Sequence, residues 1–227
     1  MSAVSSARNP RSAAGTSPGG RDIAVLVVIF TVDGGRLHVL LVRRSAEPFK
    51  DAWSLPGGLL APGESLDEAA VRKLDDETGV TDVFLEQLYT FHNLDGRGSI
   101  ATAYFALVDS PRAHLARRRA WLPAWHPIGA LPELAFDNRS VIDYALRRLQ
   151  AKLEYSNVAY SLLPAEFTLS QLQHAYEAIL GRPLDKRNFR KRMLSLGIIE
   201  ATGGTATEGR HRPARLYAFR ERKPIVF

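Results

Sequence analysis

The sequence predicts an α+β protein of two domains preceded by a tail. Its 227 residues, 45% of them hydrophobic, are enough to bury two separate cores. Strand patterns dominate residues 22–110, whereas two helical segments and a β-rich ribbon follow residue 151. The whole net charge of +6 also lies after residue 150, where 13 Lys and Arg face 7 Asp and Glu; the first 150 residues hold 17 of each. We therefore expect a disordered tail at residues 1–21, a first domain at 22–150 and a second at 151–227.

Composition excludes several classes of function. The tail is rich in Ser, Ala, Gly, Pro and Arg and has no apolar run, so it does not look like a signal peptide. Cysteine is absent, which removes disulfides, thiolate metal sites and cysteine nucleophiles. The longest apolar run, Ile23–Phe30, is far shorter than the roughly 20 residues of a membrane helix. It predicts a buried strand in a soluble, cytoplasmic protein with no membrane partner.

The first domain is predicted to be mostly β. The runs 22–32 and 36–44 flank a DGG turn signal and predict a hairpin, and further strands are expected at 53–55, 83–93 and 99–108. One helix interrupts them: Ser65 and Glu68 form a capping-box pattern, and Gly79 ends the helix. The Pro- and Trp-containing stretch 117–134 is expected to be irregular, and 137–155 to be a helix that closes the domain.

The second domain has the element order of a winged helix-turn-helix. A helix over 167–180 has Thr168 and Gln171 in capping-box register, and a helix from 184 has Asp185 as its cap. The apolar residues of the latter, Phe189, Met193, Leu194 and 196–198, are predicted to face inward. A glycine-containing ribbon over 200–219 completes the pattern.

The helix from Ser65 carries charges at spacings that suit phosphate chemistry. Arg72 and Asp76 are four residues apart, as are Lys73 and Glu77, and Glu64 precedes the helix at the Gly63 turn. Carboxylates gathered on one face suit Mg²⁺ that bridges phosphates. A solvated amphipathic helix that packs Leu66, Ala70 and Leu74 inward is the plain alternative.

The spacing of this segment resembles the box of the Nudix family, G-x5-E-x7-R-E-U-x-E-E-x-G-U, where U is a bulky aliphatic residue. Seven of the nine fixed positions match, namely Gly58, Glu64, Arg72, Leu74, Glu77, Gly79 and Val80. The upstream WSLPGG and LLVRR are also similar to this family. The resemblance covers residues 22–150 and implies an α-β-α sandwich and a history of Mg²⁺-dependent hydrolysis of nucleoside diphosphates linked to another group.

Two positions depart from the box. Asp76 replaces a glutamate and keeps its charge, whereas Lys73 replaces the glutamate that resembles a metal ligand or base, shifting the site by +2. A cation about 4 Å from a divalent ion opposes it by roughly 8 kcal/mol at an effective dielectric of about 20. We therefore expect hydrolysis to be impaired, and we assign no catalytic residue. We also expect that no cofactor is required and that Mg²⁺ binds at most weakly, at the vestigial ligands Glu64, Asp76 and Glu77.

Two hypotheses explain Lys73. In the first, its ammonium takes the place of metal charge and, with Arg43, Arg44 or Arg72, holds a diphosphate without cleaving it. In the second, Lys73 only forms a salt bridge with Asp76 or Glu77 in an inactive pocket. The predicted effector-binding residues of the first hypothesis are Arg43, Arg44, Gly58, Glu64, Arg72, Lys73, Asp76 and Glu77.

The helix from Asp185 has the residues of a recognition helix. Arg and Asn read guanine and adenine edges, and the basic residues of a wing reach phosphates or the minor groove. The N-terminus of the preceding helix offers backbone amides to a phosphate. The predicted contacts to double-stranded operator DNA are Thr168, Gln171, Lys186, Arg187, Asn188, Arg190, Lys191, Arg212 and Arg215, with Arg210 and His211 beside them.

A degenerate Nudix box followed by this basic module resembles the NrtR family of bacterial regulators of NAD metabolism over residues 22–222. The resemblance implies a homodimeric repressor that binds operators near NAD biosynthesis or salvage genes. It also implies that ADP-ribose or a related NAD metabolite is the nucleotide effector, and that binding of this effector releases the operator. Two alternatives remain open: an active, Mg²⁺-dependent Nudix hydrolase similar to ADP-ribose pyrophosphatase with an accessory basic domain, and an RNA-binding processing factor.

Overall fold

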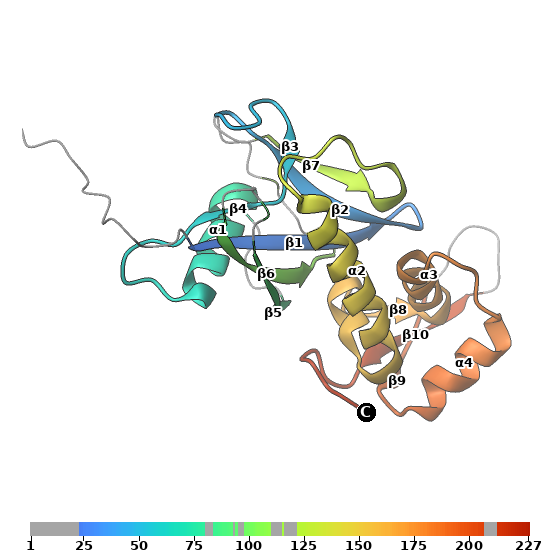
Figure 1. The fold of residues 1–227 in the computed structure, drawn as a ribbon. Coiled ribbons are helices and arrows are strands. Elements are labelled where there is room, and N and C mark those ends of the chain that lie inside the picture. The colour runs from blue at the N-terminus through green and yellow to red at the C-terminus, as the bar shows by residue number, and fades with distance from the viewer. Residues whose placement is uncertain are drawn as a thin grey trace, which may run out of the picture.

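The computed structural model describes residues 23–79, 84–92, 94, 98–109, 115, 122–206 and 213–227, apart from the side chains of residues 77 and 78. Figure 1 shows a sheet-centred N-terminal part and a smaller C-terminal part, with helix α2 running between them. The predicted tail at residues 1–21 lies outside the described residues. Among the helices described, none is both long enough and apolar enough to cross a bilayer.

The N-terminal sheet is organised around one long strand, β1. Its order is β3-β2-β1-β6-β5, with β4 also paired to β1 and β7 to β2. β1 is parallel to β6 and antiparallel to β2, and Asp33 lies opposite Arg36 across the predicted hairpin turn. The strands are β1 (Ile23–Asp33), β2 (Arg36–Arg43), β3 (Trp53–Ser54), β4 (Gly57–Leu59), β5 (Phe84–His92), β6 (Ile100–Leu107) and β7 (Leu122–Pro127).

Alternate residues of β1 pack on opposite faces of the sheet, as the two-residue period of a strand requires. Val25, Val27 and Ile29 belong to a core cluster with α1 (Leu66–Thr78). Val28 and Phe30 belong to a second cluster with α2 (Asn138–Tyr155). The sheet therefore lies between two helices, which confirms the predicted α-β-α sandwich.

Helix α1 begins and ends where the sequence predicts. The Ser65 side chain accepts from the backbone N–H of Glu68, whose carboxylate accepts from the Ser65 N–H at 2.9 Å, so the capping box is complete. Gly79 ends the helix in the left-handed conformation, with φ of 67°. The Tyr104 hydroxyl donates to Asp67 Oδ1 at 2.5 Å and ties the first turn of α1 to β6. Burial, and then this bond, raise the pKa of Tyr104 above its ordinary range.

The C-terminal part is a winged helix. The Thr168–Gln171 capping box starts α3, Gly181 ends it with φ of 68°, and Asp185 caps α4 by accepting from the Asn188 N–H. β10 lies between β8 and β9 and forms the wing with β9. The elements are η3 (Val158–Leu162), β8 (Phe167–Thr168), α3 (Leu169–Leu180), α4 (Lys186–Ser195), β9 (Ile199–Ala206) and β10 (Ala214–Phe219).

One hydrophobic core joins the two parts. The buried face of α2 lies in the same cluster as Val28 and Phe30 of the sheet and Leu172 and Ile179 of α3. Each such side chain contributes about 1.5–3 kcal/mol when fully buried. α2 also runs without a break through residue 150, so the predicted boundary falls inside a helix; that boundary remains a prediction.

Two local expectations were wrong, and one strand was missed. Residues 122–127 of the stretch predicted to be irregular form strand β7, which pairs with β2 from His38 to Arg43 at the edge of the sheet. Prolines are tolerated there because an edge strand leaves one row of backbone groups unpaired. Leu194 is 50% exposed and does not face inward, since α4 buries only Phe189 and Met193. Strand β4, built on two glycines, was not predicted.

Candidate ligand cavity and nucleic-acid interface

A cavity of about 210 Å³ opens at the Gly57–Gly58 end of the sheet. Its floor is mostly apolar, and polar groups at its wall include the Arg44 guanidinium and the Asn138 amide. The lining residues are Ala24, Leu26, Arg44, Ser54, Leu55, Gly57, Gly58, Leu59, Leu94, Ser99, Ala101, Phe136 and Asn138. An apolar pocket with a few fixed polar groups is typical of a small-molecule site.

Lys73 lies against Gly58 but does not itself line this cavity. A β-carbon built on Gly58 would lie 2.8 Å from Lys73 Nζ and 2.9 Å from its Cε. The lysine side chain of α1 therefore lies directly against a glycine that lines the cavity. Because Gly58 has no side chain, the Lys73 side chain can occupy this space.

The other charged residues of the box form an ion-pair cluster on α1. Arg72 donates to both oxygens of Glu64, at 2.5 and 2.7 Å, and lies 3.8 Å from Asp76. The hydrogen bond from Arg72, then that from the Ala61 amide, and the charge of Lys73 lower the pKa of Glu64 from 4.5 to about 2. Glu64 is therefore an anion at any physiological pH, and both of its oxygens are already engaged by a cation.

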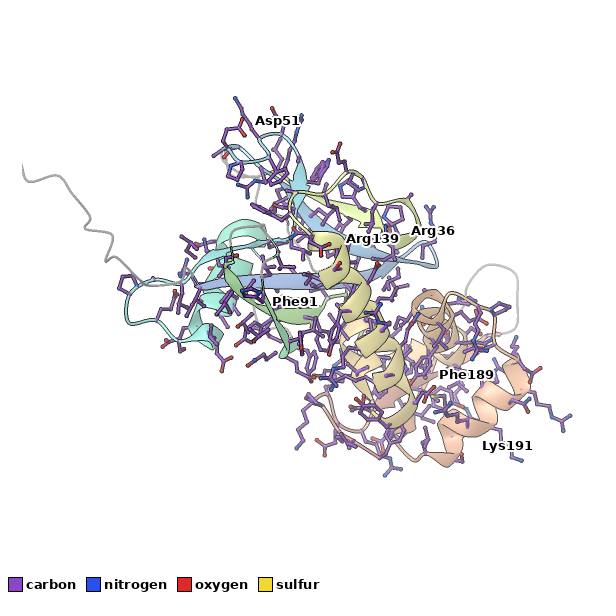
Figure 2. All side chains as sticks on the ribbon, in the orientation of Figure 1. Arg36, Asp51, Phe91, Arg139, Phe189 and Lys191 are labelled. Atoms are coloured by element: carbon purple, nitrogen blue, oxygen red, sulfur yellow. The ribbon has the colours of Figure 1, made fainter. Side chains whose placement is uncertain are left out.

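The two predicted arginines of β2 and the loop after it point to different places. Arg44 lines the cavity, where its guanidinium stacks 4.9 Å from the Phe136 ring centroid and donates to the Pro48 carbonyl. Arg43 turns instead to Asp51, bonding its carbonyl at 3.2 Å. Figure 2 shows Asp51 at the outer tip of this loop. Of the predicted effector-binding residues, Arg44 and Gly58 line the cavity, whereas the others that the structure describes, Arg43, Glu64, Arg72, Lys73 and Asp76, do not. The side chain of Glu77 lies outside the described residues.

Phe136 and Asn138 are cavity residues that sequence reasoning missed. Phe136 has a φ of +53°, an uncommon conformation for a bulky residue, and stacks edge-on against Phe49 with centroids 4.9 Å apart. Asn138 is only 2% exposed, and its Oδ1 accepts from the Leu55 N–H at 2.8 Å. The segment AFDN carries no motif that links it to WSLPGG, 83 residues earlier, so no local signal identifies it.

Helix α4 presents a row of cations to solvent. Lys186, Arg187, Asn188, Arg190 and Lys191 are all exposed, while Phe189 and Met193 are buried. Figure 2 shows Lys191 on the outer side of α4 and Phe189 on the side that faces α3. The basic residues that were predicted to contact DNA from this helix are therefore all exposed to solvent.

A second cavity, of about 320 Å³, lies where α3, α4 and the wing meet. Arg190 of α4 and Arg215 of β10 line it together with Thr168 and Ser170 at the start of α3. Two guanidinium groups beside a helix N-terminus make a site for a phosphate group. Arg212, like Arg210 and His211, lies outside the described residues.

The predicted roles of Thr168 and Gln171 change in detail. The Thr168 N–H donates to Gln171 Oε1 at 2.7 Å, and the Gln171 N–H donates to Thr168 Oγ1 at 3.2 Å. Both amides are therefore used within the capping box. The first-turn amides that α3 can offer to a phosphate are those of Leu169 and Ser170.

The fold and the two sites define a protein that joins a Nudix domain to a winged helix. The chain matches the NUDIX domain family over residues 20–145 and the NrtR DNA-binding winged helix domain over residues 159–219. A protein of Acinetobacter baylyi, named ADPR responsive transcriptional repressor NtrR, is 37% identical over 206 residues, which cover 87% of this chain and 81% of that protein. This chain belongs to the NrtR family.

Two solved structures from Shewanella oneidensis are similar to this chain. Its NrtR complexed with a 27mer DNA is 36% identical, with a TM-score of 0.77, covering 87% of this chain and 93% of that one. The NUDIX domain of the same protein complexed with ADP ribose is 34% identical, with a TM-score of 0.51, covering 60% of this chain and 95% of that one.

Proposed function

We propose that this chain is a transcriptional repressor that binds operator DNA through α4 and the wing and releases it on binding ADP-ribose or a related NAD-derived diphosphate. The observation that carries the proposal is the physical union of two sites: a cavity and an exposed cationic helix share one hydrophobic core through α2. The regulated genes are those of NAD biosynthesis or salvage. The name of the Acinetobacter relative and the two Shewanella complexes support both halves of the proposal.

The cavity suits a nucleoside diphosphate. Its apolar floor, with Leu26, Leu55 and Phe136, accepts the faces of a base or a ribose, and Arg44 is placed to pair with a phosphate. Lys73 does not line the cavity, but it lies against Gly58, which does, so it adds a positive charge near that wall. In this proposal Arg44 and Lys73 take the role that a metal ion has in a hydrolytic relative.

We further propose that the Nudix domain binds its ligand without efficient hydrolysis. Lys73 stands where a hydrolytic box has a glutamate, and Glu64 is held in a bidentate ion pair by Arg72. Within the part of the chain that the structure describes, no three His, Asp or Glu side chains gather to hold a metal ion. The Glu77 side chain lies outside the described residues, so the proposal rests on Lys73 and on the ion pair of Glu64 with Arg72, which both disfavour a resident Mg²⁺ ion.

The winged helix suits duplex DNA. The first-turn residues of α4 lie outward, as base-reading residues of a recognition helix do, and the Arg190–Arg215 cavity is placed for a backbone phosphate. Reading a palindromic operator takes two copies related by a two-fold axis, so we propose that the cytoplasmic form is a homodimer.

A mobility shift on the upstream DNA of the gene, at fixed salt and with ADP-ribose titrated in, tests both halves. We expect a shifted band that disappears as ADP-ribose is added. An effector that binds the DNA-incompetent state more tightly must weaken operator binding by the same difference in binding free energy. Absence of a shifted band would reject the repressor proposal. Efficient turnover of ADP-ribose with Mg²⁺ or Mn²⁺, abolished by Glu77→Gln, would favour the hydrolase instead.

A further inference from the structure

Helix α2 begins at the cavity and ends under the DNA-reading helix. Asn138, its first residue, lines the cavity. Twelve residues further along, about 18 Å at the helical rise, Gln150 donates to the Ile179 carbonyl in the last turn of α3. Figure 1 shows α2 extending from the level of β2 down to α3 and α4.

The Asn138 side chain has hydrogen-bonding capacity that points to a ligand. Its Oδ1 accepts from the Leu55 N–H, which fixes the orientation of the amide and leaves Nδ2 as the donor group. Asn138 is 2% exposed, and it is one of the residues that line the cavity. An amide donor that is held in a fixed orientation at a cavity wall is placed to bind an acceptor group of a ligand.

The segment just before α2 is held by the same cavity. Phe136, two residues upstream, lines the cavity with its backbone at φ of +53° and its ring under the Arg44 guanidinium. The Asp137 N–H donates to the carbonyl of Leu94, another lining residue. Unusual backbone conformations of this kind persist only where neighbouring groups hold them in place. The start of α2 is therefore fixed by cavity residues on both sides.

The far end of α2 is bonded to both helices of the winged helix. Besides the Gln150 bond to α3, Arg192 of α4 donates to the Glu154 carbonyl of α2 at 3.1 Å. Leu149 and Leu153 of α2 are buried in the same core as Phe189 and Met193 of α4. Because packed cores move between discrete arrangements and do not deform gradually, a shift of α2 must carry α3 and α4 with it or break these contacts.

We propose that Asn138 binds the effector directly through Nδ2 and that α2 transmits this contact to the winged helix through Gln150. The ligand group at Asn138 is a hydrogen-bond acceptor, a phosphate or ribose oxygen of the nucleoside diphosphate. Asn138 is thus a ligand-reading residue and Gln150 a positioning residue. The inference rests on the proposed function and deepens it, because it names the residues that couple its two sites.

The test separates binding from transmission in the full-length chain. Asn138→Asp keeps an acceptor for the Leu55 N–H and removes both donors, so calorimetry should show ADP-ribose affinity lowered about 10- to 100-fold. Operator affinity without ADP-ribose should stay at the wild-type value. Arg139→Gln, an exposed change on the next residue of α2, is the matched control and should change neither affinity.

Gln150→Met keeps the length of the side chain and removes the donor to Ile179. It should leave ADP-ribose affinity at the wild-type value while the effect of ADP-ribose on operator affinity falls several-fold; Arg148→Gln, on the exposed face of α2, is its control. In wild-type protein, the side-chain amide protons of Asn138 should shift in nuclear magnetic resonance spectra as ADP-ribose is added. That measurement stands even where a variant fails to fold.

The outcomes distinguish the two proposals. Wild-type protein that binds and responds to ADP-ribose, with unshifted Asn138 amide protons or an Asn138→Asp variant of unchanged affinity, overturns the role of Asn138. An unchanged response in Gln150→Met overturns transmission through α2. Wild-type protein that does not bind ADP-ribose at all overturns the proposed function itself.

Discussion

Lys73 of α1 lies against Gly58 of β4 so closely that a β-carbon at residue 58 would stand 2.8 Å from the lysine ammonium. Gly57, its neighbour, faces the backbone instead: a β-carbon there would lie 2.4 Å from the Val25 carbonyl oxygen. The two glycines therefore serve different purposes. Gly57 permits the pairing of β4 with β1, and Gly58 makes room for the Lys73 side chain beside the cavity wall.

Alanine substitutions should separate these purposes. Gly57→Ala is expected to lower the free energy of unfolding by about 1–3 kcal/mol or more, because backbone atoms cannot yield as a flexible side chain can. Gly58→Ala should cost little stability, since the Lys73 side chain can swing aside, but it should change ADP-ribose affinity. Urea unfolding and calorimetry measure the two effects, and equal loss of stability in both variants would contradict the assignment.

Lys73→Glu tests whether one charge silences the Nudix box. The substitution restores the glutamate of the box and changes the charge beside Gly58 by −2, so we expect Mg²⁺-dependent hydrolysis of ADP-ribose to appear. It should also weaken ADP-ribose binding in EDTA, where no metal ion can replace the lost cation. Lys73→Gln, which removes the cation without adding a carboxylate, is the control and should bind weakly without hydrolysis. If neither variant gains turnover, features other than Lys73 hold the site inactive.

Arg44 and Arg43 are neighbours in sequence with different surroundings. Arg44 lines the cavity, and Arg43 pairs with exposed Asp51 at 3.6 Å. Arg44→Gln should lower ADP-ribose affinity about 10-fold or more, the value of a charge-assisted hydrogen bond. Arg43→Gln should change it by less than about twofold, because an exposed ion pair contributes little. The reverse ranking in calorimetry would mean that the ligand lies on the Asp51 side of the loop.

Local features of this fold were predictable because neighbouring residues determine them. The capping residues Ser65, Thr168 and Asp185 and the helix-ending glycines act within one turn, so their sequence patterns located three helices. The winged helix followed from the order of such elements. The Gly63 turn likewise predicted that Glu64 lies near the charged face of α1, where it accepts hydrogen bonds from Arg72.

The features that sequence reasoning missed depend on contacts between distant segments. Asn138 meets Leu55 across 83 residues, and nothing near either residue announces the contact. Strand β7 forms because the edge of β2 is available to it, although its two prolines disfavour a strand locally. Leu194 is apolar yet exposed, because α4 packs against the core only through the face that carries Phe189 and Met193. Which of two adjacent arginines faces a cavity is decided by the loop that follows them.

Arg187 and Arg190 should contribute differently to DNA binding. Either alanine substitution should weaken binding to the operator duplex by about 1–3 kcal/mol. Arg190 lines the phosphate-sized cavity with Arg215, so its loss should weaken all duplexes alike and reduce the salt dependence of binding by about one ion. Arg187 is expected at base edges, so its loss should reduce the preference for operator over unrelated DNA. Fluorescence anisotropy at several salt concentrations distinguishes these results. Unchanged affinity in both variants would contradict the proposal that α4 lies in the major groove of the DNA.

His126 of β7 should make stability depend on pH near neutrality. Its ring packs edge-on against Trp53 with centroids 4.4 Å apart, and its Nε2 is buried with no hydrogen-bond partner in the described part of the chain. Burial, and then the charge of His38, lower the pKa of His126 below 6.5. As pH falls, the His126 imidazole therefore takes up a proton in the unfolded state at a higher pH than in the folded state.

The sign of the pH effect follows from that difference. Stability from His126 is fully present above the unfolded pKa of 6.5 and is lost as pH falls toward the lower folded pKa, because the unfolded state then binds more protons. Urea midpoints should decrease between about pH 7.5 and pH 5.5, a window in which carboxylates such as Glu64 remain ionised. His126→Phe keeps the contact with Trp53 and should flatten this dependence. If the variant and the wild type lose stability equally over the window, another group is responsible for it.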